Sequence, residues 1–307
     1  MADECTPRLV RDEIFGYRKL DPLPASAEIR EFYRLHYSRV LGDGGRARPS
    51  GLPPLSPEDM QVETRWREET LFREVADTLE SLGAKGPILD VGCGGGDLLA
   101  HLRTRGFEVT GVEPSEALAR CAVARGVPVE GGLFHDFGSV VGRWSSFGVV
   151  VFLNVFEHVI DPQEALVDAW QLLRPGGVLC IRVPNDFSEL QEAALAASGH
   201  AHPWWVCAPD HVTYFTFDSL RSLLEARGFQ VCRVSTDFPM ELFMLMGEDY
   251  VSDPGVGRRV HAARRRFDLA LPVEVRRRFY AALAAGGFGR NIMMFARKAE
   301  TAAHPPG

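Results

Sequence analysis

The sequence predicts an α/β fold: a doubly wound, mostly parallel seven-stranded sheet, with an N-terminal helical cover and a helical insertion before the last strand. Two observations predict it. From Ile88 onward, short apolar segments alternate with amphipathic helical patterns, as in chains whose parallel strands are connected by helices. Several apolar segments are uninterrupted, such as residues 149–153, and such runs are typical of strands that helices cover on both faces.

The composition is that of a globular protein. The chain has 307 residues, of which 46% are hydrophobic and 24% charged, enough for one large domain or two small ones. It contains no run of about 18 apolar residues, and its first five residues are acidic rather than apolar. The six cysteines are dispersed, without a CxxC pair. We therefore expect a cytoplasmic protein with no membrane partner and no disulfide framework.

Residues 1–82 are expected to form the N-terminal helical cover. A capping pattern and apolar spacing predict a helix over residues 26–33, and helical spacing predicts a second helix over residues 57–82. A loop rich in Pro and Gly separates the two. We expect the aromatic residues of this segment to help shape a ligand pocket: Tyr17, Tyr33, Tyr37 and Trp66.

Residues 83–238 are expected to form the core of the sheet. Strands are predicted at residues 88–91, 109–112, 127–129, 149–155, 178–183 and 229–234. Helices are predicted near residues 97–105, 115–125, 163–173 and 218–227. In sheets of this kind, ligands bind at the carboxyl ends of the strands, near the point where the strand order reverses.

The rest of the chain is divided into a helical insertion at 239–290, the last strand at 291–300 and a disordered tail at 301–307. The net charge of −7 is unevenly distributed: eleven Arg and Lys against four acids give +7 from residue 251 onward, which leaves −14 before it. The arginines of residues 258–278 either bind an anionic ligand or form a solvated helix face with local ion pairs. The preference for Arg over Lys indicates a bacterial genome rich in G and C.

The strongest chemical motif lies in residues 88–99. A buried strand turns through glycines into a helix, and glycine lets the backbone approach a ligand closely. Asp97 occupies the third glycine position of a dinucleotide fingerprint, so that fingerprint is not met. Glu113 ends the next strand about twenty residues later, where a carboxylate can accept hydrogen bonds from ribose hydroxyls.

These residues resemble the class I S-adenosylmethionine (SAM)-dependent methyltransferases. The first motif of that family, hydrophobic-hydrophobic-Asp-hydrophobic-Gly-Cys-Gly-x-Gly, matches residues 88–96. Further matches are the Glu157-His158 pair after the fourth strand and the Arg-Pro-Gly-Gly helix stop at residues 174–177. The resemblance spans about Trp66 to Phe238 and is closest to the branch that includes the ubiquinone-biosynthesis O-methyltransferases.

The resemblance implies a Rossmann-like methyltransferase fold and SAM as the cofactor. It implies that Asp90 lies near the methionine end of SAM and that Glu113 binds its ribose. The implied cofactor-binding residues are Asp90, Gly92, Cys93, Gly94, Glu113, Pro114 and Asn154. Two departures from the family pattern are Gly148, where an acid usually follows Phe147, and an atypical adenine-proximal segment at residues 131–136.

His158 and His211 are the candidate catalytic residues. Transfer of a methyl group from a sulfonium requires alignment with the nucleophile, and a hydroxyl acceptor must also lose a proton to a base. Histidine titrates near neutral pH, and His158 follows the fourth strand closely. Each of the two also has an interpretation as a hydrogen-bonded structural residue. A loop that contains Trp204 and Trp205 either covers the substrate or packs in the interior.

No metal site is expected. Some relatives hold a divalent ion with a Glu-x-x-Glu-His sequence after the fourth strand. Here Asn154 replaces the first Glu, leaving Glu157 and His158, and a hard cation prefers several oxygen ligands.

The sequence therefore predicts an enzyme, a SAM-dependent methyltransferase that methylates a hydroxyl oxygen of a small bacterial metabolite or sugar. Methylation of carbon or nitrogen on a small or phosphorylated metabolite stays open, as do RNA methylation and non-catalytic SAM binding. A nucleic-acid partner is disfavoured, because no Asn/Asp-Pro-Pro-aromatic loop follows the fourth strand and the first 250 residues are acidic. The oligomeric state is not predicted.

Overall fold

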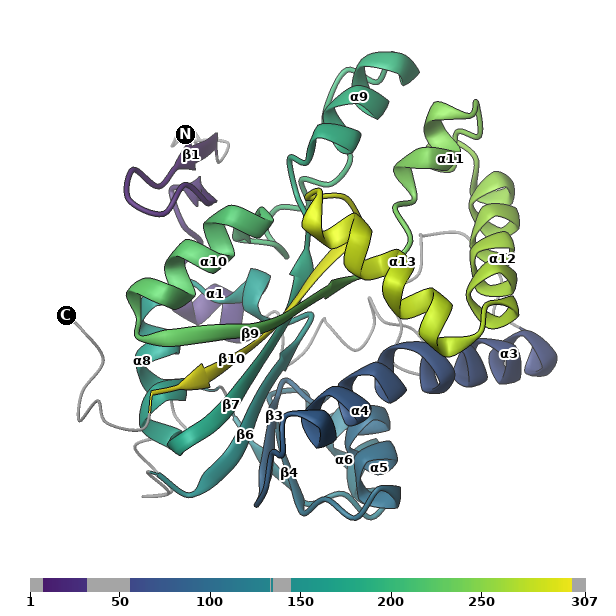
Figure 1. The fold of residues 1–307 in the computed structure, drawn as a ribbon. Helices are drawn as coiled ribbons and strands as arrows, with labels where there is room; N and C mark the ends of the chain where they lie inside the picture. Colours follow the sequence, from purple (N-terminus) through teal and green to yellow (C-terminus); the bar gives the residue numbers. More distant parts are fainter. Residues whose placement is uncertain (1–7, 32–55, 133, 135–144, 300–307) are drawn as a thin grey trace.

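The computed structural model describes residues 8–31, 56–132, 134 and 145–299 (Figure 1). Its main sheet has seven strands in the order β5-β4-β3-β6-β7-β10-β9. The first five are parallel, and β10 runs antiparallel to both β7 and β9. The strands are β3 (Ile88–Val91), β4 (Val109–Glu113), β5 (Val129–Gly131), β6 (Phe147–Leu153), β7 (Leu173–Pro184), β9 (Phe229–Thr236) and β10 (Asn291–Lys298).

Helices pack against both faces of this sheet, which confirms the predicted doubly wound architecture. The two faces follow the period-two alternation of a strand: in β6, Val149 and Val151 face one hydrophobic cluster and Val150 and Phe152 face the other. The first cluster includes side chains of α4 (Arg73–Ser81), α5 (Asp97–Thr104) and α6 (Glu116–Ala124). The second includes side chains of α8 (Pro162–Leu172) and α10 (Phe217–Ala226).

Gly148, the departure from the family pattern, has a packing explanation. A Cβ atom at this position would lie 1.7 Å from the main-chain oxygen of Lys85 and 2.7 Å from the Arg174 guanidinium. Any larger residue would therefore displace the start of β6 from the chain segment that precedes β3.

The N-terminal segment differs from the expected helical cover. Residues 8–21 form a hairpin, β1 (Arg8–Arg11) and β2 (Arg18–Asp21), which pairs with β8 (Thr213–Tyr214) in a second sheet. Leu20 packs with Val212 and Tyr214 in a small core of its own. The sequence analysis predicted no strands in this stretch of the expected cover, because the hairpin depends on a partner nearly two hundred residues away. α1 (Ser26–Glu31) follows, whereas Tyr33, Tyr37 and the Pro- and Gly-rich loop lie outside the described residues.

A long helix then runs from Pro57 to Ser81 and meets the insertion (Figure 1). It consists of α3 (Pro57–Arg67), a π-helical turn η2 (Glu68–Phe72) and α4. The Ser56 side chain caps its start by accepting a hydrogen bond from the Asp59 amide. π-helical turns are rare and occur frequently at functional sites.

The insertion is helical, as predicted, with α11 (Glu241–Leu245), α12 (Pro254–Ala270) and α13 (Val273–Ala285). Of its arginines at residues 258–278, Arg258, Arg259, Arg266 and Arg278 are exposed, as in the solvated-face interpretation, whereas Arg264, Arg265 and Arg276 are buried. Arg265 pairs with Glu63 of α3, and Arg277 pairs with Glu74 of α4. These ion pairs connect α12 to α3 and α13 to α4. Two shorter helices, η3 (Phe156–His158) and α9 (Glu189–Ser198), complete the described elements.

Within the described residues, no helix has both the length and the apolarity needed to cross a membrane. The five cysteines of this part of the chain are free thiols. The predicted tail at 301–307 lies outside the described residues.

Candidate active site

A cavity of about 1520 Å³ opens at the carboxyl ends of β3, β4, β6 and β7. The long N-terminal helix and helices α12 and α13 cover it, and we call these elements the roof. All nine residues that the sequence proposed as a site line this one cavity: Asp90, Gly92, Cys93, Gly94, Glu113, Pro114, Asn154, His158 and His211. Residues from four separate segments of the chain thus meet, as expected for an open α/β sheet.

The glycine loop between β3 and α5 forms one wall of the cavity. Gly92 and Gly94 have φ angles of +65° and +55°, which side chains rarely adopt. A Cβ on Gly92 would lie 2.6 Å from a Val155 methyl group, so the loop packs closely against the chain that follows β6. A Cβ on Gly94 would meet no described atom within 4 Å, because this glycine faces open space in the cavity.

Glu113, at the end of β4, is fixed by the loop that it faces. Its Oε2 accepts a hydrogen bond from the Gly94 amide at 2.8 Å, and its Oε1 accepts one from the Ser115 amide at 2.9 Å. Burial raises the pKa of this carboxyl, and the two amides offset part of that effect. Each oxygen retains a lone pair, so the group can accept two further hydrogen bonds from a diol.

Asp90, at the end of β3, is a buried carboxyl that lacks a full set of partners. It is 3% exposed, and its Oδ1 has no hydrogen-bond partner among the described residues. Burial, and secondly the charge of Glu113, raise its pKa to about 8. A buried carboxylate of this kind is stabilised by a cationic or hydrogen-bond-donating ligand.

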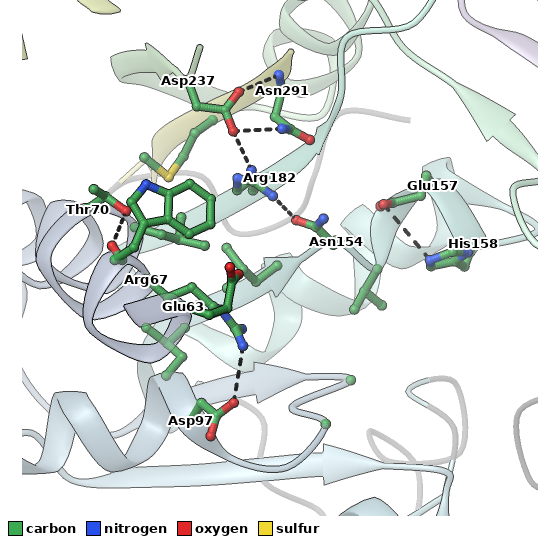
Figure 2. Close-up of a pocket in the computed structure, with 18 of the residues that line it drawn as sticks. Glu63, Arg67, Thr70, Asp97, Asn154, Glu157, His158, Arg182, Asp237 and Asn291 are labelled. Carbon is green, nitrogen blue, oxygen red and sulfur yellow. Dashed lines mark hydrogen bonds and ion pairs between the residues drawn. The ribbon is translucent and has the colours of Figure 1, made fainter. Parts of the chain in front are cut away.

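Asn154 follows β6 and lines the cavity next to Arg182 (Figure 2). It adopts φ +59°, a left-handed conformation that Asn tolerates better than most residues. Its side-chain oxygen accepts a hydrogen bond from the Arg182 guanidinium of β7. Arg182 in turn donates to Asp237 at 2.7 Å, so this wall of the cavity is a connected polar network.

His158 is held in an orientation suited to accepting a proton. Its Nδ1 lies 2.7 Å from the main-chain oxygen of Asp210. A carbonyl oxygen only accepts hydrogen bonds, so Nδ1 carries the hydrogen, and Nε2 presents its lone pair when the ring is neutral. Nε2 is 3.9 Å from the buried carboxyl of Glu157, whose pKa burial raises.

His211 has a different environment. Its ring lies edge-on to that of His158, with the centroids 5.0 Å apart. Burial, followed by the nearby charges of His158 and Arg290, lowers its pKa to about 3. The ring is therefore neutral at physiological pH, and it is a much weaker proton acceptor than an ordinary histidine.

The same residues form the one group in the described part of the chain that could hold a metal ion. Glu157, His158 and His211 each offer a ligand atom, and these atoms lie within 4.8 Å of one another. Oε2 of Glu157 has no hydrogen-bond partner among the described residues. Asn154, which replaces the first acid of the metal-binding relatives, adds no carboxylate. The absence of a metal thus stays a prediction.

Several cavity residues escaped the sequence analysis. Arg182 and Asp237 converge from β7 and from the end of β9, and Arg67 of α3 pairs with Asp97, the first residue after the glycine loop, at 3.3 Å (Figure 2). Arg182 could have been recognised from the sequence, because it is a charged residue inside an otherwise apolar strand. Its ion pair with Asp237 and the pair of Arg67 with Asp97 could not, since they depend on the tertiary fold.

The aromatic residues expected around the pocket divide into two groups. Trp66 lines the cavity, whereas Tyr17 packs in the core against Phe215. Trp204 and Trp205 pack edge-on against each other and are not part of the cavity wall. On the side of the atypical segment, Phe134 lines the cavity and packs against Phe152.

The sheet order, the glycine loop and the carboxylate at the end of β4 together define the class I SAM-dependent methyltransferases. The chain belongs to the methyltransferase-domain family, whose model matches residues 64–234. This match covers more than half of the chain and includes every candidate site residue.

Named relatives agree with this assignment. The chain is 33% identical over 135 residues to the ubiquinone biosynthesis O-methyltransferase of Pseudomonas paraeruginosa, covering 39% of this chain and 57% of the relative. It is 33% identical over 123 residues to the enzyme of that name from Maricaulis maris, covering 38% of this chain and 48% of the relative. The chain thus spans about half the length of the curated relatives it matches.

The fold is shared with solved structures. A SAM-dependent methyltransferase from Archaeoglobus fulgidus superposes with a TM-score of 0.50 at 18% identity, covering 78% of this chain and 99% of that one.

Proposed function

We propose that the protein transfers the methyl group of SAM to a hydroxyl oxygen of a small molecule. The observation that carries the proposal is the convergence in one cavity of a glycine loop, two buried strand-end carboxyls and a histidine with an oriented lone pair. The likeness to O-methyltransferases in part of the chain supports oxygen as the acceptor atom.

The residues of the glycine-loop side fit SAM. Gly94 leaves open space beside the loop, and Glu113 retains acceptor capacity for a ribose diol. The unpartnered Asp90 oxygen suits a ligand that carries positive charge, as the methionine end of SAM does. When bound, SAM supplies an activated methyl group on a sulfonium.

The protein's part in the reaction is alignment and proton removal. His158 Nε2 takes the proton from the acceptor hydroxyl as that oxygen attacks the methyl carbon in line with the breaking bond. The Asp210 carbonyl fixes the imidazole tautomer through Nδ1. His211, neutral beside it, packs against the His158 ring and orients it.

A methyl-transfer screen tests this function. The protein is incubated with SAM labelled in the methyl group and with panels of phenols, sugars and hydroxy acids. We expect label in at least one hydroxylated acceptor, with the methyl group on oxygen. Label found only on nitrogen or carbon acceptors would refute the choice of atom, and label found only in RNA would refute the choice of substrate class.

A further inference from the structure

The arginines of the insertion are not equally available to a ligand. Arg265 pairs with Glu63 at 3.2 Å, Arg277 pairs with Glu74 at 2.8 Å, and Arg259 pairs with Glu248. These arginines have carboxylate partners within the protein. The basic segment as a whole therefore does not form an anion site.

Three other guanidinium groups on the cavity wall do not each have a carboxylate of their own among the described residues. Asp237 is shared by two of them: its Oδ2 lies 2.7 Å from Arg182 and 2.8 Å from Arg264. Arg276 donates to the main-chain oxygens of Asp268 and Glu69, and the described residues include no carboxylate partner for it. We call Arg182, Arg264 and Arg276, with Asp237 and Asp268, the arginine wall.

The charges of the arginine wall do not balance. Asp237 pairs with Arg182 and Arg264, and the Asp268 carboxylate lies 3.9 Å from Arg264, so three guanidinium groups face two carboxylates and one positive charge is in excess. Asp268 is 2% exposed and already accepts hydrogen bonds from Trp66 and Tyr280. Burial raises the pKa of Asp268, so a change in its protonation could only increase the excess.

The excess charge is buried, which makes it costly. Arg264 and Arg276 are 8% and 7% exposed, and Nε of Arg264 has no acceptor among the described residues. An uncompensated buried charge is strongly unfavourable. A ligand anion in the cavity would supply the missing negative charge.

The position of Arg182 relates this wall to the reaction. Arg182 bonds to Asn154, directly after β6, and so connects the arginine wall to the end of β6 (Figure 2). Two of its five N–H donors are engaged by Asn154 and Asp237, which leaves others for a ligand. The side of the cavity around His158 carries the carboxyls of Glu157 and Asp210 and would repel an anion.

We propose that the methyl acceptor is an oxyanion, carrying a carboxylate or phosphate group, and that Arg182 and Arg264 bind that group while its hydroxyl faces His158. The inference rests on the proposed function and names its substrate class. Arginine suits this task because its planar fork binds carboxylate and phosphate oxygens with two parallel hydrogen bonds. Arg182 thereby acts as a specificity residue.

Ion binding to the full-length protein saturated with SAM tests the proposal. The probes are benzoate for a carboxylate and inorganic phosphate for a phosphate, each titrated by calorimetry. We expect at least one of them to bind, and Arg182→Gln and Arg264→Gln each to weaken its binding about tenfold or more. Arg266→Gln is the matched control, because Arg266 lies on the same helix but is exposed and not part of the cavity; it should leave binding unchanged.

Arg182→Lys distinguishes loss of charge from loss of structure, since it keeps the charge and should bind the ion more tightly than Arg182→Gln. If only benzoate binds, the anionic group of the methyl acceptor is a carboxylate. If only inorganic phosphate binds, that group is a phosphate. The proposal is overturned if neither ion binds, or if Arg182→Gln and Arg264→Gln bind as tightly as the unaltered protein. A separate SAM titration of each variant reports the cofactor site, and the methyl-transfer screen reports the proposed function, so failure of the proposed function is distinguished from failure of the anion site.

Discussion

The two candidate histidines have different environments. His158 presents Nε2 with a fixed tautomer, whereas burial gives His211 a pKa of about 3 and makes it a poor base. The sequence named both as candidate bases and distinguished them only by the closeness of His158 to the fourth strand. His158 is oriented by the Asp210 carbonyl, which lies far from it in the sequence. The pKa of His211 is lowered by burial, which depends on the tertiary fold.

Replacing His158 by Ala should lower kcat about a hundredfold, because general-base catalysis is lost. SAM affinity should stay near that of the unaltered protein, since the contacts that place His158 are with Asp210, Glu157 and His211. Steady-state kinetics with the acceptor found in the screen, together with SAM calorimetry, measures both. An unchanged kcat would show that another group removes the proton.

Asp90 should exchange a proton when SAM binds. With a pKa of about 8, this carboxyl is mostly protonated at pH 7 before binding. A cationic ligand favours the ionised form and lowers the pKa, so binding at pH 7 releases a proton to the buffer. The apparent binding enthalpy should therefore differ between PIPES and Tris buffers, whose ionisation enthalpies differ, and Asp90→Asn should remove most of that difference. Equal enthalpies in both buffers for the unaltered protein would contradict this assignment.

Chelation tests the expectation that no metal is required. Because Asn154 adds no carboxylate to Glu157, His158 and His211, EDTA followed by gel filtration should leave methyl transfer unchanged. Loss of activity that Mg²⁺ or Zn²⁺ restores would instead assign these three residues to a metal site.

At the scale of secondary-structure elements, the roof depends on ion pairs between the N-terminal helix and the insertion. Glu63 of α3 accepts from Arg265 at 3.2 Å and lies 2.9 Å from His261, and both Glu63 and Arg265 are buried. Trp66 donates to Asp268 of α12 one turn further along. The two predicted helical segments, distant in sequence, thus act as one cover over the cavity.

Glu63→Gln should lower the free energy of unfolding by about 2 kcal/mol, because it removes the nearer, buried carboxylate partner of Arg265 and leaves only the exposed Asp59 carboxylate at 3.8 Å. Chemical denaturation measures this. Glu116→Gln is a suitable control, since the exposed Glu116–Arg120 pair on α6 should matter by less than about 0.5 kcal/mol. Equal effects of the two substitutions would show that the roof does not depend on this ion pair.

At the scale of the whole molecule, the sheet core was the most predictable part. Its signals are local: uninterrupted apolar runs such as residues 149–153, the glycine loop after β3, and helix stops between strands. The hairpin at residues 8–21 was missed because its pairing partner is β8, far along the chain. Residues 127–129 were expected as a strand, and β5 occupies Val129–Gly131 instead.

The candidate site was predictable only in part. Residues next to the glycine loop and at strand ends could be named from their motifs, because strand order brings those ends together. The arginine wall could not, because Arg182, Arg264 and Arg276 come from three elements whose meeting depends on how the insertion packs. The sequence could show an excess of arginine after residue 250, but not which guanidinium groups lack a carboxylate.

The most direct test of the account is a calorimetric titration of the protein with SAM, alongside Glu113→Ala. We expect saturable binding to a single site in the unaltered protein. We expect no detectable binding in the variant, because Glu113 both holds the Gly94 amide and provides the acceptors for the ribose. Absence of SAM binding to the unaltered protein, or equal binding to Glu113→Ala, would contradict the assignment of this cavity as the cofactor site.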